Sequence, residues 1–133
     1  MNICLTISLN DIMICMQVIS LNDIGEKIFM PKKQLDILTE PMYYTLIALL
    51  TPRCGIEITE FVLQLTNQRV RLVPGTLYTM LSKFESEAMI QEVEVEGRKR
   101  TYQITHKGKQ TLKDEYKRLQ LMIQEGSSWM EGL

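Results

Sequence analysis

The chain has little cysteine or histidine, and its possible metal ligands are not grouped. Cys4, Cys15 and Cys54 are widely spaced among 133 residues, and His106 is the only histidine. This spacing excludes a disulfide framework and a structural zinc site, which needs clustered ligands. We therefore expect no metal, no cofactor, a reducing cytoplasmic compartment, and a small buried role for Cys54.

Recognisable catalytic patterns are also missing. The sequence contains no Gly-rich phosphate loop and no nucleophile at a recognisable spacing from a base. We expect His106 to be an ordinary residue in the first turn of a helix, since a catalytic histidine needs partners. The sequence therefore predicts no enzyme and no catalytic residues.

Neither sign of charge dominates the chain, whose formal net charge is -1. The distribution is uneven, because the segment 98–118 holds eight Lys or Arg residues and only two acids. Clustered cations of this kind neutralise phosphates, although a solvated face is the alternative interpretation of a charge run.

No long uninterrupted hydrophobic run is present. The most apolar stretch, 3–21, contains Asn10, Asp11 and Gln17, and a central Asp costs about 3 kcal/mol in a bilayer. No basic segment precedes it, so we expect neither a membrane span nor a secretory signal. The hexapeptide at 7–12 recurs at 19–24, but two copies do not make a solenoid. We predict that 1–29 is an N-terminal extension that the function of the remaining chain does not need.

Apolar residues at three- and four-residue steps predict two helices in the next part of the chain. The first covers 42–50, with Thr39 as its N-cap and Thr51-Pro52 as its end. The second covers 56–66, and 67–72 is predicted to be a polar loop. The residues expected on the core faces of these helices are Leu46, Leu49, Leu50, Ile58, Phe61, Val62 and Leu65.

A third helix is predicted from Pro74 to Ala88. Its apolar residues recur in steps of four, three and four, and they are Leu77, Leu81, Phe84 and Ala88. The outward positions then carry short hydroxyl, phenol and amine groups, which suit base edges and phosphates. These candidate DNA-binding residues are Thr76, Tyr78, Thr79, Ser82 and Lys83.

Beyond Ile90 the pattern alternates, which predicts a hairpin that turns at Gly97. We expect Val93 and Val95 on one face, and the glutamates 92, 94 and 96 on the other. Arg98, Lys99 and Arg100 lie at the tip, where they can contact phosphate or the minor groove. Two alternatives are protection of an edge strand and pairing with the glutamates across the hairpin.

The last predicted helix covers 106–124, with Thr105 as its cap. Its apolar residues are Leu112, Tyr116, Leu119, Met122 and Ile123. Because a small domain has little core to cover this seam, we expect it to form a two-fold homodimer interface. The alternative is that the helix docks on the first helix of its own chain.

Four segments together resemble the PadR family of bacterial transcriptional regulators. They are Gly55 to Ile58, Gly75 to Tyr78, Phe84 to Ile90, and Tyr102 to Gly108. The resemblance implies a mainly α fold with a small β-hairpin: a winged helix-turn-helix followed by a C-terminal dimerisation helix. It also implies that Gly75, Thr76 and Tyr78 begin the recognition helix and that 98–100 lie on the wing.

The chain departs from the family pattern at three places. Ile56 replaces an aromatic residue, Ala88 replaces a glycine, and the C-terminal region is short, as in the family's small-type members. Trp129, the only tryptophan, is a candidate platform for an effector, although packing alone is the alternative.

The predicted organisation is an extension at 1–29, a winged helix-turn-helix at 30–105, and a dimerisation helix with its tail at 106–133. The leading hypothesis is a dimeric repressor that binds double-stranded DNA sequence-specifically and is released by a small aromatic or hydrophobic effector. The alternative is a winged-helix module that binds protein and has no operator of its own.

Overall fold

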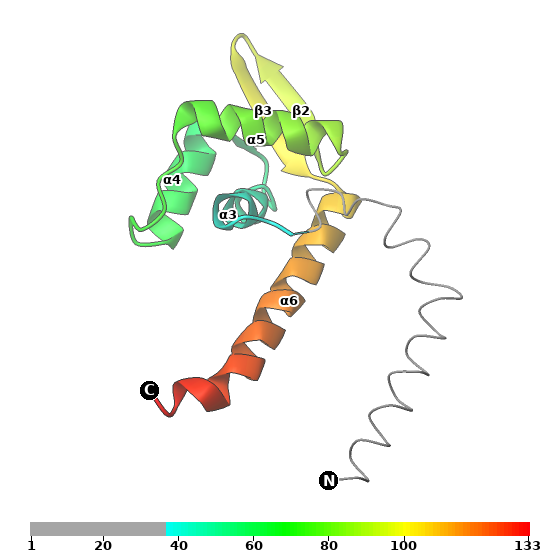
Figure 1. The fold of residues 1–133 in the computed structure, drawn as a ribbon. Coiled ribbons are helices and arrows are strands. Elements are labelled where there is room, and N and C mark those ends of the chain that lie inside the picture. The colour runs from blue at the N-terminus through cyan, green and yellow to red at the C-terminus, as the bar shows by residue number, and fades with distance from the viewer. Residues whose placement is uncertain (1–36) are drawn as a thin grey trace, which may run out of the picture. The chain divides into compact units, whose positions relative to one another are not determined.

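The computed structural model describes residues 37–133, so the predictions for 1–29, Cys4 and Cys15 lie outside the described residues. The elements in chain order are α3 (Glu40–Ala48), β1 (Arg53–Cys54), α4 (Gly55–Leu65), α5 (Pro74–Ser86), β2 (Ile90–Glu96), β3 (Lys99–Ile104) and α6 (His106–Met130) (Figure 1). The predicted fold class is confirmed: a winged helix-turn-helix followed by a long helix. Between residues 37 and 133, no helix is long and apolar enough to cross a membrane.

The core is formed where α3, α4 and α5 meet. Leu46, Ile58, Val62 and Phe84 are all fully buried there. The buried hydroxyl of Thr45 is satisfied within its own helix, since it donates to the Pro41 carbonyl at 2.7 Å. Because this hydroxyl forms a hydrogen bond, its burial costs little free energy.

The ends of α3 and α4 differ from the prediction. The first helix covers Glu40–Ala48, so Leu50 lies in the following turn and is 48% exposed. Thr39 occupies the N-cap position of α3 but makes no side-chain cap bond. Leu65 is also half exposed because it lies at the last residue of α4. The predictions that Leu50 and Leu65 face the core are therefore wrong.

The turn between α4 and α5 is well packed, which corrects its prediction as a polar loop. Val70 and Leu72 are buried in it. Asn67 and Gln68 have φ values of 49° and 65°, and the Gln68 N–H donates to the Leu63 carbonyl at 2.8 Å. This bond closes the end of α4 in the manner of a Schellman motif, in which asparagine tolerates the left-handed conformation.

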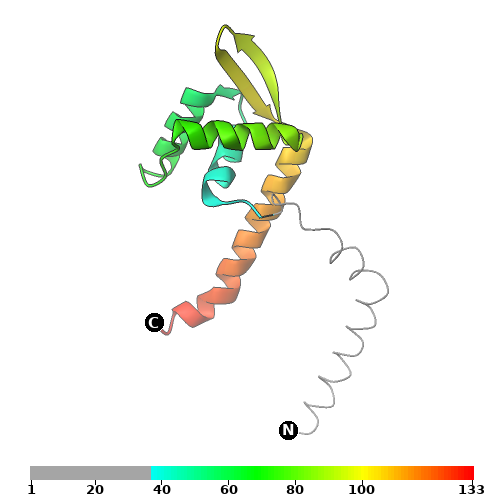
Figure 2. The same cartoon turned by 45° about the horizontal axis from the view of Figure 1, so that its top comes forward.

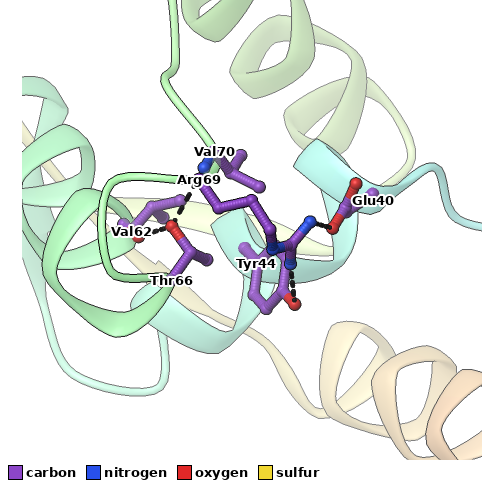
Figure 3. Close-up of polar contacts among 6 residues, drawn as sticks. All are labelled: Glu40, Tyr44, Val62, Thr66, Arg69 and Val70. Atoms are coloured by element: carbon purple, nitrogen blue, oxygen red, sulfur yellow. Dashed lines mark hydrogen bonds and ion pairs between the residues drawn. The ribbon is translucent and has the colours of Figure 1, made fainter.

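Arg69 anchors the same turn to α3 (Figure 3). Its guanidinium donates to the Glu40 carboxylate and, at 3.0 Å, to the Tyr44 hydroxyl. The Thr66 hydroxyl donates to the Val62 carbonyl at 2.8 Å and accepts from the Val70 N–H at 3.1 Å. The chain entering α5 is therefore held from both sides.

The end of α5 also differs from the prediction. The helix ends at Ser86, so Ala88 lies outside it, is exposed, and does not face the core as expected. Ala88 has φ 57°, and the Met89 N–H donates to the Phe84 carbonyl at 2.8 Å. The chain keeps the left-handed turn that glycine would adopt without strain. The core positions are instead taken by Met80 and Met89.

The sheet has three antiparallel strands in the order β1-β3-β2. The hairpin of β2 and β3 was predicted, whereas β1 is only two residues long and carries no alternating pattern. Its Arg53 guanidinium lies 4.2 Å from the centre of the Phe61 ring, a cation–π contact that covers this half-buried side chain. The strand thus ties α4 to the middle of β3, where Arg53 and Cys54 pair with Tyr102 and Thr101.

Helix α6 begins against the sheet and then runs away from it (Figures 1 and 2). The predicted cap is confirmed, since the Thr105 hydroxyl accepts from the Gly108 N–H at 3.2 Å. The helix continues to Met130, six residues beyond the predicted end at 124. Its N-terminal half packs on α3 and β3.

Candidate nucleic-acid interface

Helix α5 has the orientation that the sequence predicts. Leu77, Leu81 and Phe84 are buried beneath it. The five candidate DNA-binding residues lie on the other side: Thr76, Tyr78, Thr79 and Ser82 are exposed, and Lys83 is partly exposed. An amphipathic helix with this arrangement presents polar groups along one open face.

Two of these side chains are held by their neighbours. The Thr79 hydroxyl donates to the Gly75 carbonyl at 2.9 Å, so it presents its methyl group and an acceptor outward. The Tyr78 hydroxyl lies beside the first turn of α4, only 3.4 Å from where a Cβ at Gly55 would be. Tyr78 remains 59% exposed, and its rigid ring therefore bridges the open surfaces of α4 and α5.

The wing, which is the hairpin of β2 and β3, departs from a regular hairpin at one point. Its register shifts between Glu92 and Glu94, which leaves Val93 without a partner. Glu92 pairs with Tyr102 and Val95 pairs with Arg100. Directly paired residues share a face of the hairpin, and Tyr102 and Arg100 share a face because they are two residues apart on β3. Glu92 and Val95, which pair with them, therefore lie on the same face. The prediction that all three glutamates point one way and both valines the other is therefore wrong.

A groove lies between the helix-turn-helix and the wing. Its cavity volume is about 830 Å³. The groove brings together three parts of the chain that are far apart in sequence: the start of α4, the outer side of α5, and the wing. The residues that line it include Gly55, Ile56, Glu57, Tyr78, Ser82, Glu85, Arg98, Lys99, Arg100 and Tyr102. Thus the groove joins Tyr78 and Ser82 to all three wing cations, while Thr76, Thr79 and Lys83 lie outside its lining.

The charges around the groove are mixed. The Glu57 carboxylate accepts from the Cys54 N–H at 2.8 Å, and this bond lowers the pKa of Glu57. Cys54 is buried, as predicted, and caps α4. Hydrogen bonding to Tyr102, followed by the charge of Glu92, raises the pKa of Arg100. The guanidinium of Arg100 is therefore engaged within the protein.

The start of α4 is the part of this surface that the sequence prediction missed. Gly55 and Ile56 line the groove, and Ile56 is 72% exposed. The sequence pattern does indicate this residue, since Ile56 lies off the core-facing stripe of its helix. It also lies in the first turn, where backbone N–H groups lack helical partners. An apolar side chain at such a position is consistent with a contact surface.

The apolar seam of α6 divides into two parts. Leu112 is buried within this chain, so at this residue the alternative of docking on the first helix is realised. Leu119 is partly exposed, whereas the other three predicted interface residues are largely exposed: Tyr116 53%, Met122 53% and Ile123 71%. Trp129 is helical and 78% exposed.

The boundary between the two parts is an ion pair. Glu115 is 3% exposed, and its carboxylate receives two hydrogen bonds from Arg118, at 2.6 and 2.9 Å. These bonds, together with a weaker one from the Leu38 backbone, lower the pKa of Glu115. Elsewhere in residues 37–133, no group of three or more Cys, His, Asp or Glu side chains could hold a metal ion.

Several solved structures share this fold at low sequence identity. A transcriptional regulator from Clostridium thermocellum is 20% identical, with a TM-score of 0.57 over 66% of this chain and 86% of that chain. A PadR family regulator from Clostridium difficile R20291 is 19% identical, with a TM-score of 0.55 over 67% and 97%. RosR from H. salinarum is 19% identical, with a TM-score of 0.53 over 66% and 76%.

A comparison with curated protein sequences finds no match. The model of the transcriptional regulator PadR-like family, in contrast, matches residues 45–114, more than half of the chain. The matched region runs from α3 through the recognition helix and the wing into α6. The chain therefore belongs to the PadR-like family of transcriptional regulators.

Proposed function

We propose that this protein is a homodimeric, sequence-specific transcriptional repressor that acts in the cytoplasm. The observation that carries the proposal is the groove between α5 and the wing. It places an open face of hydroxyl groups next to a basic hairpin tip. A winged helix-turn-helix uses such neighbouring surfaces to read bases with the helix and to grip the flanking backbone with the wing.

Helix α5 supplies the base-reading surface. Its outer residues offer short hydroxyls at 76, 79 and 82, a phenol at Tyr78 and an amine at Lys83. Such groups donate to and accept from base edges in the major groove, and they also bind phosphate oxygens. We expect Tyr78 to matter most among them, because its hydroxyl lies over the start of α4 and its ring is exposed.

The wing tip, residues 98–100, supplies positive charge beside this helix. Residues 98–100 are exposed, so the tip can approach the backbone or the minor groove that flanks a half-site. The overall charge of -1 does not oppose this role, because binding depends on local charge at the contact.

The second half of α6 supplies the dimer interface. Tyr116, Leu119, Met122 and Ile123 leave apolar surface uncovered by the described chain. Association with a second copy buries this surface and places two recognition helices about one turn of DNA apart. Exposed Trp129 extends the same helix and offers a ring on which an aromatic or hydrophobic effector can stack, relieving repression.

A mobility-shift assay on the gene's own promoter region tests the proposal. We expect specific binding that weakens in the Tyr78→Phe variant and falls steeply with salt. A Lys113→Gln variant is the matched control, since Lys113 is an exposed cation on α6 that lies outside the groove lining. Equal affinity for the promoter and for random DNA would remove sequence specificity from the proposal.

A second candidate function is a winged-helix module that binds protein. Exposed Val93 and Val95, interspersed with glutamates 92, 94 and 96, favour it, because apolar and acidic groups on a wing do not attract DNA. The same assay discriminates between the two, since a protein-binding module shows no shift with any duplex at physiological salt.

A further inference from the structure

Arg100 occupies a different position from the other two cations of the wing tip. It lies on β3 directly opposite Val95, on the face of the hairpin that also carries Tyr102 and Glu92. Tyr102 is buried and lines the groove together with Arg100 and Glu85 of α5. The side chain of Arg100 therefore lies where three elements meet: β2, β3 and the recognition helix.

Arg100 forms an ion pair with Glu92 on the adjacent strand. Its Nη1 atom lies 3.7 Å from a carboxylate oxygen of Glu92, whose side chain is 28% exposed while that of Arg100 is 62% exposed. The neighbouring Tyr102 side chain, the charge of Glu92 and, more weakly, that of Glu85 raise the pKa of Arg100. The structure thus pairs Arg100 with Glu92 on the adjacent strand, and Glu85 of α5 lines the same groove.

Arg98 and Lys99 are different. Arg98 follows the turn residue Gly97, and Lys99 begins β3 opposite Glu96. Within the part of the chain that the structure describes, neither side chain makes a hydrogen bond or an ion pair, and the Lys99 charge acts on Glu57 only through space. Both retain the capacity to neutralise a phosphate.

We propose that Arg100 is a positioning residue that holds the two strands of the wing together through Glu92, on the side of the wing that lines the groove with α5, while Arg98 and Lys99 bind the DNA backbone. This inference rests on the proposed DNA-binding function and assigns different roles to the three cations of the wing tip. A cation that contacts a protein carboxylate and no phosphate makes no phosphate contact that its loss could remove, so the number of counterions released on binding stays the same. A cation that binds phosphate changes the counterion count directly.

The salt dependence of DNA binding separates the two roles. Affinity for the promoter duplex is measured between 50 and 300 mM KCl for wild type, Arg98→Gln, Lys99→Gln and Arg100→Gln. We expect Arg98→Gln and Lys99→Gln each to reduce the slope of log affinity against log salt by about 0.9. Arg100→Gln should weaken binding by about two- to five-fold, as for an exposed ion pair, and leave the slope unchanged. A slope reduced by Arg100→Gln as much as by Arg98→Gln would overturn the proposal.

A second measurement needs no DNA. Amide hydrogen exchange reports how firmly the hairpin is held. We expect Arg100→Gln and Glu92→Gln to increase exchange across β2 and β3 to the same extent, and the double variant to add little, because both remove one contact. Lys99→Gln is the matched control and should leave exchange unchanged. Equal exchange in Arg100→Gln and Lys99→Gln would overturn the positioning role.

The two measurements also separate this inference from the proposed function. A wild-type protein that binds no duplex at any salt concentration refutes the DNA-binding function, and the exchange measurement then decides the role of Arg100 alone. A wild-type protein that binds DNA with a slope sensitive to all three cations leaves the function standing and refutes the inference.

Discussion

Gly108 offers the sharpest test of how α6 is attached to the domain. A Cβ atom at this buried position would lie 2.1 Å from the Met89 carbonyl oxygen and 2.6 Å from Cγ1 of Ile104. Side chains essentially never approach backbone closer than 3.0 Å, so the helix or the strand must move by about 1 Å in Gly108→Ala. The Met89 carbonyl cannot withdraw freely, because it also accepts from the Thr105 N–H at 2.9 Å.

The cost of this substitution has three parts. Overpacking costs about 1–3 kcal/mol, and weakening the Thr105–Met89 hydrogen bond costs about 1–3 kcal/mol. Replacing glycine by alanine within a helix returns about 1 kcal/mol. We therefore expect Gly108→Ala to lower the free energy of unfolding by about 3 kcal/mol, measured by urea unfolding at a fixed protein concentration.

Gly126 is the matched control for Gly108. It lies in the same helix, and nothing is within 4 Å of where its Cβ would be. Gly126→Ala should therefore be neutral or stabilise by up to about 1 kcal/mol. If both variants changed the urea midpoint equally, the close packing of Gly108 against Met89 would not be what holds the helix.

Three other changes have defined outcomes. Ala88→Gly should raise the free energy of unfolding by about 0.5–1 kcal/mol, read from the urea midpoint, because alanine at φ 57° is strained and glycine is not; an unchanged midpoint contradicts that strain. Glu115 has a lowered pKa in the folded state, so its contribution is present above the unfolded pKa of about 4.3 and is lost as pH falls through the folded value. The Tm of wild type should therefore fall more than that of Glu115→Gln from pH 6 to pH 3, and parallel curves would show that this carboxylate is not responsible. Ile123→Asp should dissociate the proposed dimer in sedimentation, whereas Gln124→Asp, an equal charge beside it, should not; dissociation by both argues against an interface centred on Ile123.

The sequence predicted the middle of each helix better than its ends. Leu77, Leu81 and Phe84 are buried as their spacing predicts, because the 3.6-residue period holds within a regular helix. The predictions that Leu50 and Ala88 face the core are both wrong for one reason: each residue lies just beyond a helix end. The helical period no longer decides which way a side chain points once the backbone has left the helix.

Loops and charges were harder to predict, because both depend on contacts between distant parts of the chain. Val70 is buried in the turn between α4 and α5 because Arg69 and Thr66 fold that turn back onto α3 and α4. The sequence alone does not distinguish the cations of segment 98–118 that bond within the protein from those that do not. In the structure, Lys107 donates to the Glu87 carbonyl at 2.6 Å, and Arg118 pairs with Glu115. A count along the chain therefore overestimates the number of cations whose side chains are not already bonded within the protein.

The division of α6 at Glu115 constrains how an effector can act. Up to this residue the helix packs on its own domain, and beyond it the apolar side chains are largely exposed. At about 1.5 Å per residue, Trp129 lies about 30 Å along the helix from Gly108, where α6 contacts the sheet. A small molecule at Trp129 is thus too far from α5 to cover it. The proposed effector would therefore act on the proposed dimer, by changing how two copies of α6 pack and so altering the distance between the two α5 helices.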